Sequence, residues 1–222
     1  MKILGYSERG IINSIIFNIG DKIHLVKDLV NLISFPNKID IGDPDDYTIL
    51  LEQSLSRFGD CDLIIIFTYN SSKRKTVLFL EAKVKTIQGK WSLDKHFESY
   101  NYLPVKKGNT SNLFSQLYLK RLLMEDYDPV QKSAIDKYNK VRKIGKNDIV
   151  HKAFSQFSDA TDKFYIGIIP ATDLEIHAFL GKHFKYSCPY YFVSWKSIHD
   201  FCILNNLSKV LEVFDHNKGQ IY

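Results

Sequence analysis

The chain contains few cysteines, and none of them lie close together. Its 222 residues include only Cys61, Cys188 and Cys202, with no Cys-x-x-Cys pair. This spacing indicates neither a zinc site nor a disulfide framework. Cys61 and Cys202 lie in apolar stretches and are expected to be plain core residues. We therefore expect a reducing compartment.

Long hydrophobic runs are also absent. The longest apolar runs are far shorter than the about 20 residues that a membrane-spanning helix needs, so we expect no membrane partner. Charged residues interrupt residues 1–9 before the apolar run of a signal peptide can form. The expected location is the cytoplasm.

The histidines and the net charge exclude some classes of function and leave others open. The seven histidines form no metal-spaced cluster and surround no single serine or cysteine, which excludes a zinc enzyme or a catalytic triad. The formal net charge of +5 is compatible with a polyanionic partner without requiring one. A hydrophobic content of 45% suffices for one sizeable core, so we expect residues 1–222 to form a single domain.

The order of the predicted elements indicates a mixed α/β domain around one sheet. The expected helices are 7–19, 21–32, 112–124, 132–146, 147–157 and 197–204. The expected strands are 47–51, 63–67, 76–80, 164–169 and 190–195. Residues 84–111 are polar and are expected to form a long loop, which in a compact domain is usually functional or disordered.

Two of the expected strands form the informative element. Residues 63–67 and 76–80 are unbroken apolar runs, which are typical of strands covered on both faces. The polar turn at 70–75 is short, so the two strands are predicted to form a hairpin.

The hairpin brings charged residues to its open end. A turn centred between Ser72 and Lys73 places Asp62 opposite Lys83. Because side chains alternate between the faces of a strand, Glu81 and Lys83 share a face. Two carboxylates and an ammonium are therefore expected to converge where the two apolar strands finish.

This grouping is suited to a divalent cation. Burying a carboxylate is costly without a partner or a metal, and two adjacent carboxylates repel each other unless a cation offsets their charge. Mg²⁺ commonly uses one or two carboxylates together with waters and phosphate oxygens. A neighbouring lysine can then orient or deprotonate the attacking water. We therefore expect Mg²⁺, or Mn²⁺, at this site.

The residues at this end of the hairpin match a known motif. Segment 59–65 reads Gly-Asp-Cys-Asp-Leu-Ile-Ile and triplet 81–83 reads Glu-Ala-Lys. They resemble the PD-(D/E)XK nuclease superfamily, with Asp62 as the first Asp and Cys61 where the motif has Pro. The triplet matches the E-x-K element.

Two helices add to this resemblance. Glu8, on the first expected helix, matches the additional acidic residue that many members carry. Gln116 resembles the Gln of the Q-x-x-x-Y motif of exonuclease-type members, although Lys120 stands where that motif has Tyr. The resemblance covers about residues 6–124.

The resemblance implies a restriction-endonuclease-like core and metal-dependent hydrolysis of nucleic acid, with DNA as the expected substrate. The implied metal ligands are Asp62, Glu81 and the main-chain carbonyl of Ala82. The implied catalytic residues are Lys83, Glu8 and Gln116. The expected nucleic-acid contacts are Lys106, Lys107 and Lys120.

Several alternatives stay open at this point. Asp60 competes with Asp62 for the metal, and Glu52 is a further possible ligand. The lysine-rich segments are compatible with ordinary solvated surfaces. A catalytically inactive nucleic-acid-binding or structural protein of the same fold, an RNA-cleaving enzyme, and a homodimer are all compatible with the sequence.

Overall fold

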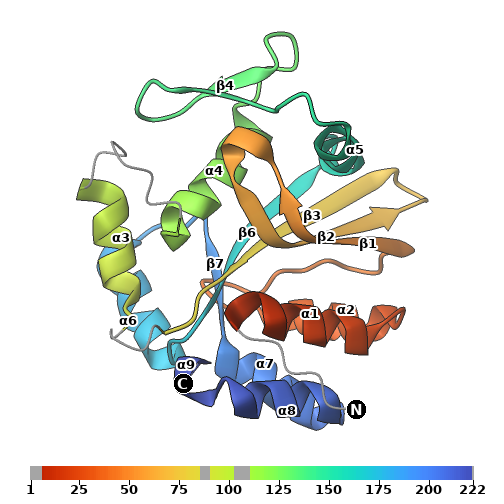
Figure 1. Ribbon diagram of the computed structural model, residues 1–222, viewed down its shortest axis with the longest axis vertical. Helices are drawn as coiled ribbons and strands as arrows, with labels where there is room; N and C mark the ends of the chain where they lie inside the picture. Colours follow the sequence, from red (N-terminus) through yellow and green to blue (C-terminus); the bar gives the residue numbers. More distant parts are fainter. Residues whose placement is uncertain (1–6, 86–90, 103–110, 222) are drawn as a thin grey trace. The chain divides into compact units, whose positions relative to one another are not determined.

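The fold is built around a mixed five-stranded sheet flanked by helices (Figure 1). It is seen in a computed structural model, which describes residues 7–85, 91–102 and 111–221. The strand order is β1-β2-β3-β6-β7, which confirms the predicted mixed α/β class. The strands are β1 (Asp46–Ser54), β2 (Asp60–Tyr69), β3 (Arg74–Ala82), β6 (Asp162–Ile169) and β7 (Tyr191–Ser194).

Both antiparallel and parallel pairs occur in this sheet. The strands β1, β2 and β3 pair antiparallel in sequence order, whereas β6 and β7 are parallel. The Thr161 amide donates to the Lys75 carbonyl, and the Lys83 amide donates to the Ile168 carbonyl. The residue numbers of both partners rise from the first bond to the second, so β3 and β6 run parallel.

The chain forms two compact units. Unit 1 comprises Met1–Ile41, Ala82–Asp94 and Ile166–Tyr222. Unit 2 comprises Gly42–Glu81 and Lys95–Tyr165. The organisation of residues 1–222 as a single domain stays a prediction.

Unit 2 holds the predicted hairpin and two of the predicted helices. The apolar runs of β2 and β3 are buried, as expected for strands covered on both faces. Asn112 caps α4 (Leu113–Glu125) and Asn147 caps α5 (Asp148–Phe157), each through a side-chain oxygen that accepts a main-chain N–H. The rings of Phe157 and Phe79 pack edge to face, with centroids 5.3 Å apart, so α5 contacts β3.

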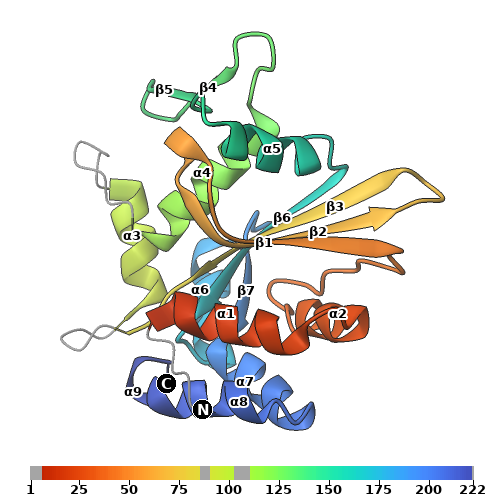
Figure 2. The same cartoon turned by 45° about the vertical axis from the view of Figure 1, so that its right-hand side comes forward.

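Unit 1 is largely helical. Its first helices, α1 (Ser7–Ile19) and α2 (Ile23–Asn31), confirm the amphipathic patterns of the sequence. Figure 2 shows α1 beside α8 (Ser208–His216), which in turn packs against α7 (Trp195–Leu204). Among the described residues, no helix has the length and apolar character needed to cross a bilayer.

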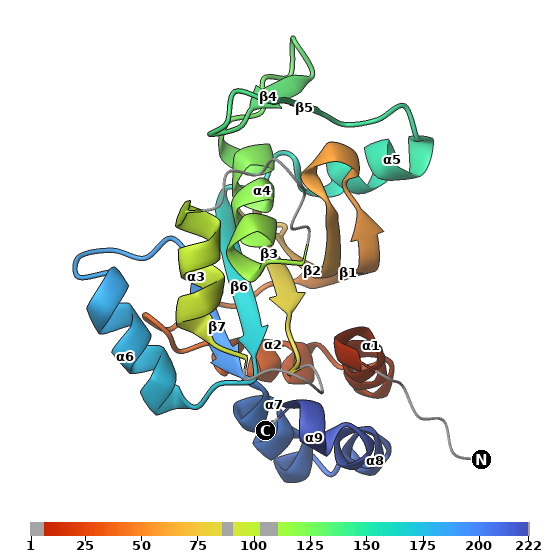
Figure 3. The same ribbon diagram turned by 60° about the vertical axis from the view of Figure 1, so that its left-hand side comes forward.

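One predicted loop is partly helical. Residues 84–111 were expected to form a loop, but α3 (Leu93–Tyr102) lies within them. Phe97 and Tyr100 of this helix pack against Phe114 of α4, and the two helices lie close together in Figure 3. The loop prediction was wrong because these tertiary contacts stabilise a segment whose own composition is polar.

The predicted helix at 132–146 is also wrong. This segment forms a hairpin of β4 (Ser133–Ile135) and β5 (Val141–Lys143). The Asp136 carboxylate holds its turn, because it accepts the amides of Tyr138 and Lys140 and pairs with Arg142. Side-chain bonds of this kind favour a turn over a helix.

Besides α3, three further helices among the described residues were not predicted from the sequence. They are α6 (Asp173–His183), α8 and α9 (Lys218–Ile221). The start of α6 did carry a signal, since the Thr172 hydroxyl accepts the Glu175 amide while the Glu175 carboxylate accepts the Thr172 amide. This reciprocal pair is a capping box, which marks helix starts in a sequence.

Candidate metal site at the end of the hairpin

Two carboxylates lie directly beyond the last pair of the β2–β3 ladder. Leu63 pairs with Leu80, and one further step along the ladder brings Asp62 opposite Glu81. Directly opposite residues of an antiparallel pair point to the same face. Asp62 is 6% exposed and Glu81 is fully buried, so both acids lie within the protein interior.

The predicted register was therefore wrong by two residues, since Asp62 was expected opposite Lys83. The turn spans only 70–73, because Tyr69 already pairs with Arg74. Arg74 and Lys75 were counted as turn residues, but they belong to β3 and form ion pairs with Asp162 and Asp159. The shift of two keeps the face of each side chain, so the carboxylates still converge.

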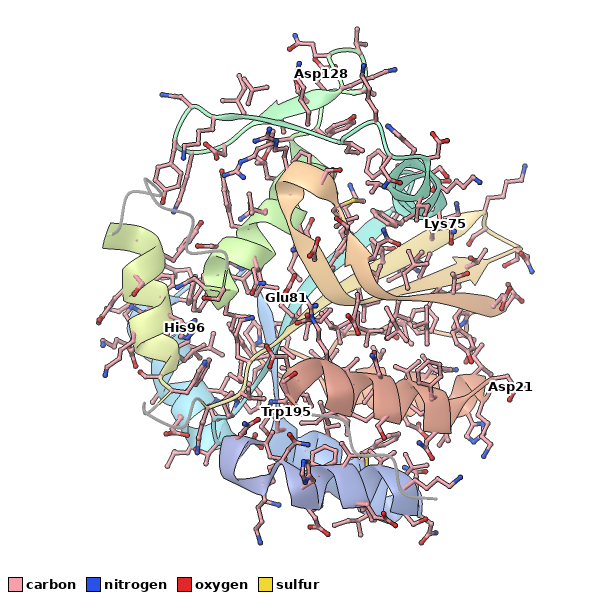
Figure 4. The ribbon with its side chains drawn as sticks, viewed as in Figure 1. Asp21, Lys75, Glu81, His96, Asp128 and Trp195 are labelled. Atoms are coloured by element: carbon pink, nitrogen blue, oxygen red, sulfur yellow. The ribbon has the colours of Figure 1, made fainter. Side chains whose placement is uncertain are left out.

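A third charged group joins the two carboxylates from α4. The Lys120 ammonium lies 2.7 Å from Glu81 Oε1, and it donates a 2.5 Å hydrogen bond to the main-chain carbonyl of Asp60. The side chains of Lys120 and Glu81 are both 0% exposed. Figure 4 shows Glu81 at the end of β3, next to α4. One buried lysine thus links α4 to both strands of the hairpin.

Electrostatics keep this lysine charged. Burial by itself lowers the pKa of Lys120, because it disfavours the ammonium. The negative charge of Glu81 acts in the opposite direction, as do Cys61 and Asp62, and the pKa of Lys120 ends above its ordinary value. The ion pair with Glu81 therefore favours the charged form of Lys120.

Cys61 directly precedes Asp62 on β2 and lies in the core. Its thiol is fully buried and is oriented towards the carbonyls of Leu63 and Leu80. Burial, followed by the charge of Glu81, raises the pKa of Cys61 well above its ordinary value. A thiol that is not deprotonated has little nucleophilicity, so Cys61 is a core residue, as predicted.

Ala82 and Lys83 continue the chain from Glu81 into unit 1. The Lys83 amide donates to the Ile168 carbonyl, and the Lys83 carbonyl accepts the indole N–H of Trp195 at 2.8 Å. These bonds fix the main chain at Lys83. The Lys83 side chain is 9% exposed, and within the described ranges its ammonium has no ion pair or hydrogen bond.

Two further predicted site residues lie on helices. Glu8 is half-buried in the first turn of α1, in unit 1, as the sequence predicted. Gln116 lies one turn before Lys120 on α4, and residues four apart share a helix face. The side-chain oxygen of Gln116 is buried and has no hydrogen-bond partner in the part of the chain that the structure describes. Gln116 therefore lies on the face of α4 that carries Lys120.

The predicted nucleic-acid contacts have different outcomes. Lys106 and Lys107 lie outside the described residues. Lys120 was expected to contact a phosphate group, but its ammonium is buried against Glu81 and is not accessible in this conformation. A sequence signal did exist, because Lys120 lies three residues after the buried Leu117 on the apolar face of α4.

The competing acids are placed differently. Asp60 and Glu52 are exposed, in contrast to Asp62 and Glu81. Glu52 stands at the position of β1 that would face Asp62, but its φ of 49° interrupts the regular ladder there. No group of three or more His, Cys, Asp or Glu residues suited to a metal occurs in the residues described. Among the acids of β1, β2 and β3, Asp62 and Glu81 are the buried pair.

Comparisons with known proteins gave no match. No protein-family model, no curated protein and no solved structure matches the chain. The membership of the PD-(D/E)XK superfamily therefore stays a prediction that rests on the motif residues.

Proposed function

We propose that this protein is a metal-dependent nuclease of the PD-(D/E)XK type, which hydrolyses phosphodiester bonds in nucleic acid and acts on DNA. The observation that carries the proposal is the pair of buried carboxylates, Asp62 and Glu81, at the open end of the hairpin. A structural protein has little reason to bury two adjacent acids, since each costs free energy without a compensating cation.

The donor set suits a hard divalent cation. Asp62, Glu81 and the carbonyl of Ala82 supply only oxygen ligands, which Mg²⁺ and Mn²⁺ prefer. Two carboxylates are a common protein contribution to a Mg²⁺ site, where waters and substrate phosphate oxygens complete the coordination. The bound cation would supply charge neutralisation at the phosphate and a water of lowered pKa.

The protein residues would then divide the remaining tasks. Lys83, whose ammonium has no ion pair or hydrogen bond with the described residues, would orient the water and offset negative charge on the phosphate. Gln116 offers a buried amide oxygen that can accept a hydrogen bond from that water. Lys106 and Lys107 would contact phosphates, and Glu8 would supply a further acidic group. A homodimer stays a prediction.

One observation favours a second function. The Lys120 ammonium already neutralises Glu81, so the cluster satisfies part of its charge without any metal. A catalytically inactive protein of the same fold could bind nucleic acid or act as a structural component. Its buried Glu81 would need only the ion pair with Lys120. Absence of Mg²⁺ and Mn²⁺ binding would favour this second function, because a metal-dependent nuclease requires a bound cation.

The direct test is a cleavage assay with purified protein. Supercoiled plasmid, linear DNA and RNA are each incubated with Mg²⁺, with Mn²⁺, or with EDTA. We expect DNA to be cleaved with either metal and to remain intact with EDTA. Nucleic-acid binding without cleavage under all three conditions would support the inactive protein instead.

Replacing Lys83 with Ala should reduce the cleavage rate by roughly 10²–10⁴-fold, which is typical for the loss of an acid–base group. Metal affinity should stay the same or rise slightly, because a neighbouring positive charge is removed. Single-turnover cleavage and Mn²⁺ titration measure the two effects separately.

Lys85→Ala is the matched control for this substitution, since Lys85 lies two residues further along the same segment. It should keep wild-type cleavage. A Lys83→Ala variant that cleaves at the wild-type rate would remove Lys83 from the mechanism.

A further inference from the structure

The Glu81 carboxylate already binds one cation within the protein. Its Oε1 lies 2.7 Å from the Lys120 ammonium, and the side chains of both residues are fully buried. The second bond of Lys120, to the carbonyl of Asp60, anchors the ammonium in this position. One of the two oxygens of Glu81 is therefore engaged by α4.

This engagement limits how many metal ions the cluster can hold. In two-metal sites the ions lie about 3.5–4 Å apart and need shared or additional ligands. A carboxylate that bridges two ions uses one oxygen for each, and Glu81 has at most one oxygen left for a metal.

The charge balance leads to the same limit. The buried Lys120 ammonium lies 2.7 Å from Glu81 Oε1 and offsets negative charge there, so less of it is left to attract metal ions. A second metal ion would lie within a few Å of a buried ammonium, where repulsion is only weakly screened.

We infer that this site binds a single divalent cation, and that the Lys120 ammonium takes the place that a second metal ion would occupy at Glu81. The inference rests on the proposed function, since it requires that Asp62 and Glu81 bind a metal at all. It assigns to Lys120 a role at the metal site instead of a contact with nucleic acid.

The number of bound ions can be measured in the wild-type protein without any assay of cleavage. Mn²⁺ is added in steps, bound metal is counted by equilibrium dialysis, and the electron paramagnetic resonance spectrum is recorded at each step. Asp62→Asn serves as the reference for ions bound elsewhere on the surface. We expect one Asp62-dependent Mn²⁺ with an uncoupled spectrum.

Two other outcomes have separate meanings. An Asp62-dependent pair of ions with a spin-coupled spectrum in the wild type would overturn the single-ion inference and leave the nuclease proposal intact. Absence of any Asp62-dependent Mn²⁺ would reject the proposed metal site, and the inference with it.

Variants of Lys120 test its role directly. Lys120→Met removes the charge at similar length and should raise the number of Asp62-dependent ions from one to two, with a coupled spectrum. Lys120→Arg keeps the charge and should retain one ion. A folded Lys120→Met variant that still binds one ion would overturn the assignment of Lys120. Should Lys120→Met not fold, the wild-type count still decides the single-ion inference.

Discussion

Replacing Asp62 with Asn or Glu81 with Gln should abolish metal-dependent cleavage. Each substitution keeps the shape of the side chain but removes one ligand charge. Loss of an outer-shell partner typically costs roughly 10–100-fold in metal affinity, and loss of a ligand should cost more. Mn²⁺ titration and single-turnover cleavage of plasmid DNA measure the two losses.

The matched controls are the exposed acids of the same strands. Asp60→Asn and Glu52→Gln remove carboxylates that lie on β2 and β1 but outside the buried pair. Both should keep metal binding and cleavage. Circular dichroism of every variant distinguishes a lost ligand from a lost fold. Undiminished cleavage in Asp62→Asn and Glu81→Gln would discard the mechanism, and loss of activity in Asp60→Asn alone would move the site to Asp60.

Replacing Lys120 with Met should lower the free energy of unfolding by about 3–5 kcal/mol, the usual cost of removing one partner of a buried ion pair. The reason is that Glu81 and Asp62 would be left buried without their internal cation. Urea denaturation, monitored by circular dichroism and tryptophan fluorescence, measures this loss.

Two comparisons make this prediction specific. Lys196→Met removes a lysine from the exposed pair with Asp200 on α7, and it should cost about 0.3–0.5 kcal/mol, as for other exposed helix pairs. The double variant Lys120→Met, Glu81→Gln removes both charges and should be more stable than Lys120→Met alone. If Lys120→Met and Lys196→Met cost the same, the buried pair does not stabilise the fold.

The hairpin shows which structural features a sequence pattern can predict. The apolar runs at 63–67 and 76–80 predicted two buried strands, and both are present because burial of such runs is the dominant stabilising term in folding. The predicted register was wrong by two residues, because the length of a turn depends on where the strands stop pairing. Arg74 and Lys75 look like turn residues in the sequence, but they pair with Tyr69 and Thr68 in the β2–β3 ladder. Their side chains also form ion pairs with Asp162 and Asp159.

Some helices could be predicted from their local sequence, and others depend on tertiary contacts. The predicted helices at 112–124 and 147–157 are present as α4 and α5. Asn112 and Asn147 cap their starts through amides only a few residues away. By contrast, α3 depends on contacts of Phe97 and Tyr100 with Phe114, which a polar local composition does not reveal. Capping residues and amphipathic patterns predict helices that depend on nearby residues, but not helices that depend on tertiary packing.

The sequence by itself determined that the protein has a mixed α/β fold and that Asp62 and Glu81 converge at the end of a hairpin, because strand alternation and the apolar runs require it. Only the tertiary structure decided that they lie directly beyond the last pair of the β2–β3 ladder and that Lys120 binds Glu81. That ion pair joins residues from different elements, and its strength comes from complete burial, which no local pattern encodes.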